Sequence, residues 1–309
     1  MKLLLEVPLN RLSFGNVSYN IIRELHSRDV DLAIFPINPV DQIDLSAFDP
    51  PQEIKEYIDQ AVKKRWQFLK ENVPCFKLWH LNGSDNRKTR DQFLFSFYEC
   101  NKPTEEEISI CAAQNKTLFS SSHAVECFQE QGCENVRFVP LGFDKDFFRY
   151  GNNNKYQLSC CVNNVFFQPE QMKGIINETL GGQHYNNINF LPSLDKNSEV
   201  NELLNSIDID LTGLSGGEGW NLPAFNSTCL GKWSIVLNCT SHKDWATENN
   251  SILIEPSGEM PVEDGVFFSP SNPFNKGTFY TWQEEQVVAA METAESKAGQ
   301  INSEGSMRI

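Results

Sequence analysis

The sequence predicts an α/β protein built from two Rossmann-like halves of roughly 150 residues each. Short apolar runs alternate with segments whose apolar residues recur at helical spacing, a pattern typical of a parallel sheet covered by helices on both faces. The alternation pauses at the polar run Gly151–Asn154 and then starts again. The chain has 309 residues, 40% of them hydrophobic, which is enough for two such cores.

The elements of the first half follow from their apolar patterns. The segment Pro51–Glu71 illustrates the helices, because its apolar residues, among them Ile54, Val62 and Trp66, fall on one stripe. The strands are short apolar runs bounded by polar residues. We expect strands at Leu3–Val7, Asp31–Pro36, Phe76–Leu81, Gln92–Tyr98, Thr117–Ser120 and Val136–Pro140, and helices at Val17–Ser27, Pro51–Glu71, Glu105–Asn115 and Ala124–Gln131.

The second half repeats this order and ends in a long amphipathic helix. We expect strands at Gln157–Val162, Ile188–Leu191, Asp208–Thr212, Ser234–Leu237 and Ile252–Ile254, and helices at Met172–Leu180, Glu199–Ser206, after Glu218, and at Trp282–Ala298. The pattern predicts a first domain at residues 1–150 and a second at 151–281. The terminal helix, 282–298, is a candidate to pack back on the first domain, and residues 299–309 are expected to form a loose tail.

Composition narrows the classes of partner and the compartment. The formal net charge of −15 repels phosphate backbones and anionic lipids, which disfavours nucleic acid as a partner without excluding it. No segment approaches the roughly 20 apolar residues of a membrane-spanning helix. The nine cysteines form neither a CxxC pair nor a cluster at metal-binding spacing. We therefore expect reduced, buried cysteines in a cytoplasmic protein.

One loop stands out as a candidate ligand site. The expected strand Asp208–Thr212 runs into Gly-Leu-Ser-Gly-Gly-Glu-Gly-Trp-Asn-Leu-Pro at residues 213–223. Its glycines would let the backbone approach a ligand, and Pro223 suits the first turn of a helix whose N-terminus attracts phosphate. Glu218 at this position can accept hydrogen bonds from sugar hydroxyls. The same residues also fit an ordinary strand–helix turn with a solvated glutamate, and the local sequence leaves both readings open.

The segment that begins at Glu218 resembles the C-terminal signature of retaining glycosyltransferases of family 4. In that family an acidic residue leads a Gly-aromatic-Gly-Leu-Pro turn, which Glu218-Gly-Trp-Asn-Leu-Pro matches, and the resemblance implies that Glu218 holds hydroxyls of the donor sugar. The family's second glutamate, which binds the ribose, corresponds to Asn226, and Asn221 replaces a usual glycine. An amide can still hydrogen-bond a ribose but brings no charge. The implied fold is GT-B, with two Rossmann-like domains whose parallel sheets face each other across a cleft.

Segments of the first half resemble the same family. Phe119–Phe128 and Asn135–Asp144 look like the strand–Ser–helix and strand–turn segments that end its first domain, and the resemblance covers most of residues 14–298. Glu99 stands at a strand end where many members have a histidine and a subset has a glutamate. The resemblance implies that Glu99 contacts the sugar or orients the acceptor hydroxyl. His80 ends the preceding strand and is a second catalytic candidate, with a purely structural role as the alternative.

The resemblance also implies a phosphate site. Phe14-Gly15-Asn16 matches the family's glycine loop near the donor phosphate or acceptor, and Lys173 is the expected cation at the diphosphate. The position of a second cation, an arginine in the family, corresponds to Asn163 or Asn164. The turn and helix start after Glu218 complete the expected set of phosphate contacts: Gly219, Trp220, Asn221 and Leu222.

The implied activity is transfer of a sugar from a nucleotide diphosphate, with UDP favoured, to an acceptor hydroxyl with retention of anomeric configuration. The nucleotide-sugar is a substrate, and neither a cofactor nor a metal is expected, because Asp208 and Asp210 fit strand alternation better than a metal-binding Asp-X-Asp. Compact acidic relatives of this kind resemble those of some bacteriophages, which would place the protein in the host cytoplasm. The acceptor would be a glycan, a protein or a modified nucleobase. A catalytically weak nucleotide-sugar-binding protein and an epimerase or hydrolase of the same fold remain alternatives.

Overall fold

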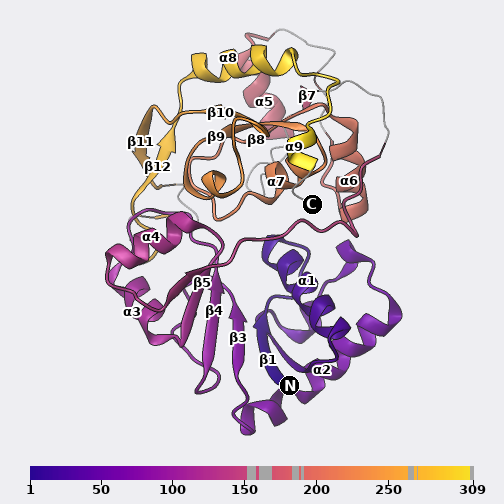
Figure 1. Cartoon of the computed structure of the whole chain (residues 1–309), viewed down its shortest axis with the longest axis vertical. Coiled ribbons are helices and arrows are strands. Elements are labelled where there is room, and N and C mark those ends of the chain that lie inside the picture. The colour runs from indigo at the N-terminus through magenta and orange to yellow at the C-terminus, as the bar shows by residue number, and fades with distance from the viewer. Residues whose placement is uncertain are drawn as a thin grey trace.

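The structure is a computed structural model that describes residues 1–151, 158–159, 169–182, 188, 191–263, 268–269 and 271–306. Two parallel sheets organise the described chain, and Figure 1 shows them one above the other, with the first half of the sequence below. A small antiparallel pair of strands lies at the side of the second half, close to the first.

The first sheet has six parallel strands in the order β2-β1-β3-β4-β5-β6. The strands are β1 (Lys2–Val7), β2 (Asp31–Pro36), β3 (Cys75–Leu78), β4 (Gln92–Ser96), β5 (Lys116–Phe119) and β6 (Val136–Phe138). The helices of this half are α1 (Ser13–Ser27), α2 (Gln52–Lys70), α3 (Glu105–Ala113) and α4 (Ser122–Glu130), with short 3-10 turns η1 (Val40–Gln42) and η2 (Ser46–Phe48). Each strand was predicted, and the bounds of β2 are those expected from its apolar run.

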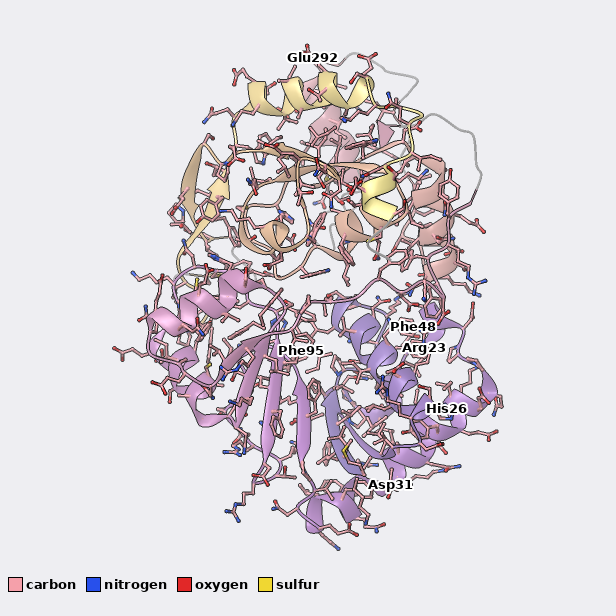
Figure 2. The ribbon with its side chains drawn as sticks, viewed as in Figure 1. Arg23, His26, Asp31, Phe48, Phe95 and Glu292 are labelled. Atoms are coloured by element: carbon pink, nitrogen blue, oxygen red, sulfur yellow. The ribbon has the colours of Figure 1, made fainter. Side chains whose placement is uncertain are left out.

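Helices cover this sheet through apolar and aromatic contacts. Phe95 of β4 and Phe48 of η2 belong to one buried cluster, which lies beside α1 in Figure 2. Within it the rings of Tyr19 and Phe48 stack with centroids 4.5 Å apart. Trp66, expected on the buried stripe of α2, is instead 55% exposed and contacts Phe35 edge-on. The buried face of α2 turns through Phe68 at that end, so the stripe drifts away from Trp66.

The second sheet has four parallel strands in the order β10-β9-β8-β7. They are β7 (Leu158–Ser159), β8 (Ile209–Gly213), β9 (Trp233–Leu237) and β10 (Ser251–Ile254). The other elements of this half are α5 (Pro169–Thr179), α6 (Asn197–Ser206), α7 (Leu222–Cys229), η3 (Thr240–Asp244), β11 (Gly258–Pro261), β12 (Thr278–Thr281), α8 (Glu284–Glu295) and α9 (Ser303–Ser306). Most of the predicted strands Gln157–Val162 and Ile188–Leu191 lies outside the described residues.

The C-terminal segment differs from its prediction. Ala290 and Ala294 of α8 pack in one cluster with Ile235 and Ile252, so α8 covers the second sheet and does not return to the first. Nor are residues 299–306 loose. Asn302 is 1% exposed, and its amide donates to the carbonyl oxygens of Lys232 at 2.9 Å and Asn250 at 2.6 Å. A buried amide with two acceptors fixes this segment on the second sheet, up to residue 306.

The segment Ser271–Thr281, here called the cross-arm, reaches from the second half to the first. Thr278 N–H donates to Asn101 Oδ1 at 2.9 Å, and Asn275 N–H donates to Glu107 Oε1 at 2.8 Å. Phe279 packs against the buried cluster that lies between the first sheet and helices α3 and α4. The cross-arm was not predicted, and it ties the two halves together at one side.

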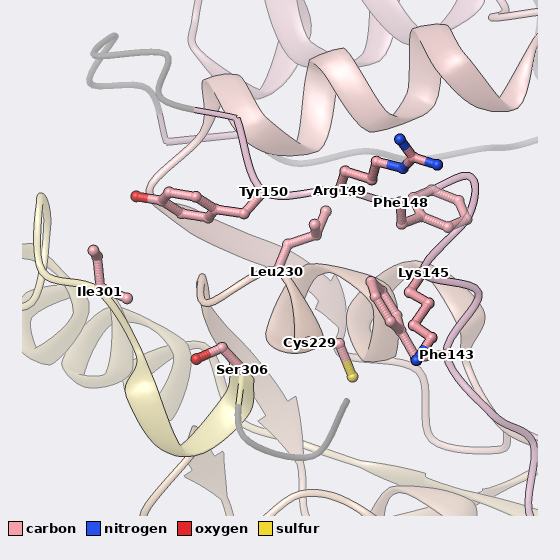
Figure 3. Close-up of a pocket in the computed structure, with 9 residues that line it drawn as sticks. All are labelled: Phe143, Lys145, Phe148, Arg149, Tyr150, Cys229, Leu230, Ile301 and Ser306. Atoms are coloured by element: carbon pink, nitrogen blue, oxygen red, sulfur yellow. The ribbon is translucent and has the colours of Figure 1, made fainter.

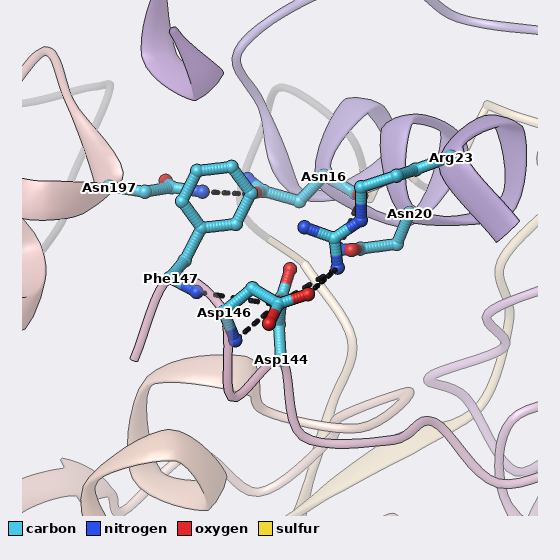
Figure 4. Close-up of polar contacts among 7 residues, drawn as sticks. All are labelled: Asn16, Asn20, Arg23, Asp144, Asp146, Phe147 and Asn197. Carbon is cyan, nitrogen blue, oxygen red and sulfur yellow. Dashed lines mark hydrogen bonds and ion pairs between the residues drawn. The ribbon is translucent and has the colours of Figure 1, made fainter. Parts of the chain in front are cut away.

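Polar contacts tie the halves together near the connecting chain as well (Figure 4). Asp144 accepts hydrogen bonds from Arg23 Nη2 at 3.1 Å and from the N–H of Phe147 at 3.4 Å. Asn197 of α6 donates to Asn16 Oδ1 of α1 at 2.8 Å. The connection that leaves the first sheet is therefore anchored on α1, which also touches α6 of the second half.

Candidate active site

The loop of Glu218 joins β8 to α7 and is held by both halves. Ser120, which follows β5, donates through Oγ to the carbonyl oxygen of Gly219 at 2.5 Å. The N–H of Glu218 donates to Thr240 Oγ1 at 3.3 Å. A Cβ added to Gly219 would lie 2.7 Å from Cβ of Phe97, so the loop rests directly on the end of β4. The Glu218 side chain is partly accessible at this junction.

The glycines of this loop serve protein packing. A Cβ on Gly216 would lie 1.8 Å from the carbonyl oxygen of Tyr280, and one on Gly217 would lie 2.2 Å from the ring of Phe279. Tyr280 N–H also donates to Gly216 O at 3.0 Å. The expectation that these glycines make room for a ligand is thus corrected: they admit the cross-arm and Phe97.

Glu99 lies against the loop that carries Glu218. The carbonyl oxygen of Glu99 lies only 2.9 Å from the position of a Cβ on Gly217. Burial raises the pKa of Glu99 to about 8, and the neighbouring Glu218 charge adds to that rise. Burial raises the pKa of Glu218 to about 7. Since both pKa values lie far above that of an ordinary glutamate, the pair retains a proton near neutral pH.

His80 lies beside the same junction within a group of aromatic rings. Its ring centroid is 4.6 Å from that of Phe14 and 5.2 Å from that of Trp79. Phe14 in turn lies 4.4 Å from Phe97, which contacts Gly219. Desolvation lowers the pKa of His80, although the residue stays exposed. The structure therefore brings His80 to the aromatic edge of the junction, as a neutral group that a ligand can reach.

Asn221 shapes the start of α7. Its φ of 64° is left-handed, a conformation that asparagine tolerates better than most residues, so it can occupy a position for which the family 4 resemblance implied glycine. Its Oδ1 accepts from Ala224 N–H at 3.2 Å, and its Nδ2 lies 2.9 Å from Thr212 O and 3.1 Å from His242 Nε2. The side chain is thus engaged in a cap and an internal network rather than directed to a phosphate.

His242 completes this network and was not singled out from the sequence. Its Nδ1 lies 2.8 Å from the carbonyl oxygen of Leu237, so Nδ1 donates there and Nε2 accepts from Asn221. Burial lowers the pKa of His242 to about 4, which keeps the ring neutral. Its signal in the sequence is weak, because a single histidine after a strand gives no hint of a partner in a distant loop.

The N-terminus of α7 offers few amide groups for a phosphate. Pro223 has no N–H, and the N–H of Ala224 is taken by Asn221. Of the first three residues of α7, Leu222 alone has a backbone N–H that is neither missing, as in Pro223, nor bonded to Asn221, as in Ala224. The side chain of Trp220 is 5% exposed and packs on Phe225, so it belongs to the core.

The remaining predicted phosphate and ribose residues have other surroundings. Gly15 lies in the first turn of α1, where a Cβ would be 1.8 Å from the carbonyl oxygen of Asn10, and Asn16 bonds Asn197. Lys173 is exposed on α5, and Asn226 is 9% exposed on α7. The expected arginine position, Asn163 or Asn164, falls outside the described residues. Phosphate and ribose contacts by this set remain predictions.

Other expectations concern cysteines, metals and membranes. The seven cysteines in the described ranges form no disulfide and are buried, as predicted. Asp210 is fully buried in β8, where its carboxylate accepts from Thr212 Oγ1 at 2.8 Å. Within the described ranges, no three His, Cys, Asp or Glu side chains gather as a metal site would require. In the same residues, every helix is too short or too polar to cross a bilayer.

Comparisons with known proteins identify the architecture. No protein-family model and no curated sequence matches the chain. Sucrose-phosphate synthase from Thermosynechococcus elongatus superposes with a TM-score of 0.62 at 11% identity, covering 100% of this chain and 94% of that one. HepE from Anabaena in complex with UDP superposes at 0.58, with 11% identity and coverage of 99% and 93%. Trehalose-6-phosphate synthase, studied with bisubstrate glycomimetics, superposes at 0.56, with 11% identity and coverage of 100% and 93%.

These neighbours are glycosyltransferases of the GT-B fold. Their superposition extends over nearly the whole of this chain, including both parallel sheets. The predicted fold class is therefore confirmed: the chain is an α/β protein with the GT-B fold.

Proposed function

We propose that the protein is a glycosyltransferase that moves a sugar from a nucleotide diphosphate to an acceptor hydroxyl. The observation that carries this proposal is that the backbone of Glu99, from one half of a GT-B fold, lies against the Glu218 loop of the other half, near enough for the Glu218 charge to raise the pKa of Glu99. A fold of this kind binds its ligands beyond the carboxyl ends of its parallel strands. Glu99 follows β4 and Glu218 follows β8, so both stand at such ends.

UDP is the favoured nucleotide, and retention is the favoured stereochemistry. Support for UDP comes from HepE, which has been solved with UDP and with UDP-glucose. Support for retention comes from trehalose-6-phosphate synthase, which was studied as an enzyme of glycosyl transfer with retention. The family 4 signature at Glu218 favours both. The compact, acidic chain is in keeping with a bacteriophage enzyme working in the host cytoplasm without metal or cofactor.

The residues divide the reaction between them. The bond from the anomeric carbon to the diphosphate breaks, a bond to the acceptor oxygen forms on the same face of the sugar, and the acceptor proton passes to the leaving phosphate. Glu218 binds hydroxyls of the donor sugar, and Glu99 orients the acceptor hydroxyl. Because burial raises the pKa values of both carboxyl groups, the pair shares a proton near neutral pH. The ring of His80, whose pKa is lowered by desolvation, borders the acceptor.

The diphosphate is held less firmly than the sugar in this proposal. Lys173 supplies a positive charge and the amide of Leu222 a hydrogen bond, but Pro223 and the Asn221 cap withdraw two amides from the start of α7. Asn226 would bond the ribose without adding charge. We therefore expect weak affinity for free UDP and a larger contribution from the sugar.

The test separates transfer from its alternatives by the product. The protein is incubated with UDP-, GDP- and ADP-sugars, with and without glycan, protein and modified-nucleobase acceptors, and released nucleotide and sugar products are measured. The proposal is supported if the wild type forms acceptor-linked sugar. Glu218→Gln should then lose this activity, and the exposed control Glu106→Gln should keep it. Free sugar alone indicates a hydrolase, and an altered donor sugar an epimerase. Binding without turnover across the acceptor panel would overturn transferase activity and leave a binding protein.

A further inference from the structure

A pocket of about 440 Å³ lies at the connection between the two halves (Figure 3). This volume is within the range of small-molecule sites in proteins. Its walls come from the connecting chain at residues 143–150, the C-terminal end of α7, and the fixed C-terminal segment at Ile301 and Ser306. None of the loop around Glu218 lines it, so the pocket is separate from the proposed sugar site.

The interior of the pocket is apolar. Phe143 and Phe148 lie with their ring centroids 6.0 Å apart, and both pack with Leu230 in one cluster. Figure 3 shows these three side chains grouped together within the pocket. Such a surface gains free energy by covering an apolar or aromatic group of a ligand.

The charged residues that line the pocket are both cations. Lys145 and Arg149 are exposed beside the apolar surface, with the half-exposed Tyr150 next to them, although the whole protein carries a formal charge of −15. In the part of the chain that the structure describes, no ion pair is formed by either cation. The acidic neighbours of Lys145 are directed to another partner: Asp144 and Asp146 pair with Arg23 at 3.1 Å and 3.3 Å. Among the described residues, the two positive charges are therefore left without an acidic partner, as a site for an anionic ligand requires.

We propose that this pocket binds a small organic anion, in which an apolar or aromatic group carries a phosphate or a carboxylate. The apolar group would lie on Phe143, Phe148 and Leu230, and the anion would pair with Lys145 and Arg149. An arginine forms two parallel hydrogen bonds to either kind of anion, which favours both over a neutral group. The inference rests on this pocket alone and does not depend on the proposed transferase activity.

Binding of matched naphthalene probes to the full chain tests the proposal. Three fluorescent probes, 1-naphthyl phosphate, 1-naphthoate and the neutral 1-naphthol, are each titrated with the protein. Inorganic phosphate is added as a competitor. We expect saturable binding of the phosphate or the carboxylate probe, at least about tenfold tighter than that of 1-naphthol. The stronger of the two anionic probes identifies the anion. Equal affinity for 1-naphthol, or no saturation below millimolar probe, would overturn the proposal.

Two variants and a competitor locate the binding. Lys145→Glu with Arg149→Glu should weaken binding at least about tenfold, and Ile301→Trp, at a 62% exposed position of the rim, should block it. Lys55→Glu with Lys70→Glu changes the net charge equally on the exposed face of α2 and should leave binding unchanged. Equal loss in this control pair would show nonspecific attraction. If UDP displaces the probe at the concentrations at which UDP itself binds the protein, the probe occupies the site of the sugar donor. Either this displacement or an equal loss in the control pair would overturn the proposal.

Discussion

Replacing Gly219 with alanine should move the Glu218 loop away from Glu99 while leaving both halves of the protein folded. The new Cβ would lie 2.7 Å from Cβ and 3.2 Å from Cα of Phe97, whereas non-bonded carbons rest roughly 3.5–4.0 Å apart. The loop must therefore withdraw by about 1 Å, which carries Glu218 away from Glu99. Overpacking of this kind costs about 1–3 kcal/mol of stability, and a displacement of about 1 Å lowers catalytic rates on the order of 100-fold.

The measurements are urea unfolding and donor-dependent release of UDP, with Gly142→Ala as the matched control. Gly142 lies in the connecting chain, and an added Cβ there meets nothing within 4 Å. We expect the control to keep both stability and rate. A Gly219→Ala protein that unfolds and turns over like the wild type would show that Phe97 does not set the position of the loop.

Three further predictions concern stability, each measured by urea unfolding. Because burial raises the pKa values of Glu99 and Glu218, the folded chain keeps protons that the unfolded chain has released, so stability should fall as pH rises from 4.5 to about 8; a slope unchanged in the double glutamine variant would refute this. Asn302→Ala removes the amide that donates to the carbonyl oxygens of Lys232 and Asn250 and should cost about 1–3 kcal/mol, against no change if the C-terminal segment is loose. Arg23→Ala leaves the mostly buried Asp144 carboxylate unpaired and should also cost about 1–3 kcal/mol; a cost below about 0.5 kcal/mol would argue against the anchor on α1.

The strands of both sheets were predictable because buried parallel strands have nearly continuous apolar sequences. Asp31–Pro36 is one case, because Leu32–Phe35 is a continuous apolar run. The pair β11 and β12 lacked such a signal. All four residues of β11, Gly258–Pro261, are exposed. Their partner β12 belongs to the cross-arm and is held in place by its contacts with the first half. No local pattern encodes contacts of that kind.

The candidate site also contains features that the local sequence predicts and others that depend on contacts between distant segments. Glu218 and Glu99 were predicted from motifs at strand ends, and the parallel topology explains why the loop of one lies against the other. The sequence indicated that Gly216 and Gly217 permit close approach, but it could not tell that the approaching group is the cross-arm. It likewise gave no pairing of Asn221 with His242, since that hydrogen bond joins loops that follow different strands.

A double-mutant cycle on UDP release tests whether Glu218 and Glu99 form one site across the two halves. Glu218→Gln and Glu99→Gln should each lower the rate on the order of 100-fold, with the fold intact by circular dichroism. Because groups that act as a unit are not additive, the double variant should lose little more than either single variant. A wild-type rate in Glu218→Gln, or losses that multiply fully in the double variant, would contradict a shared site.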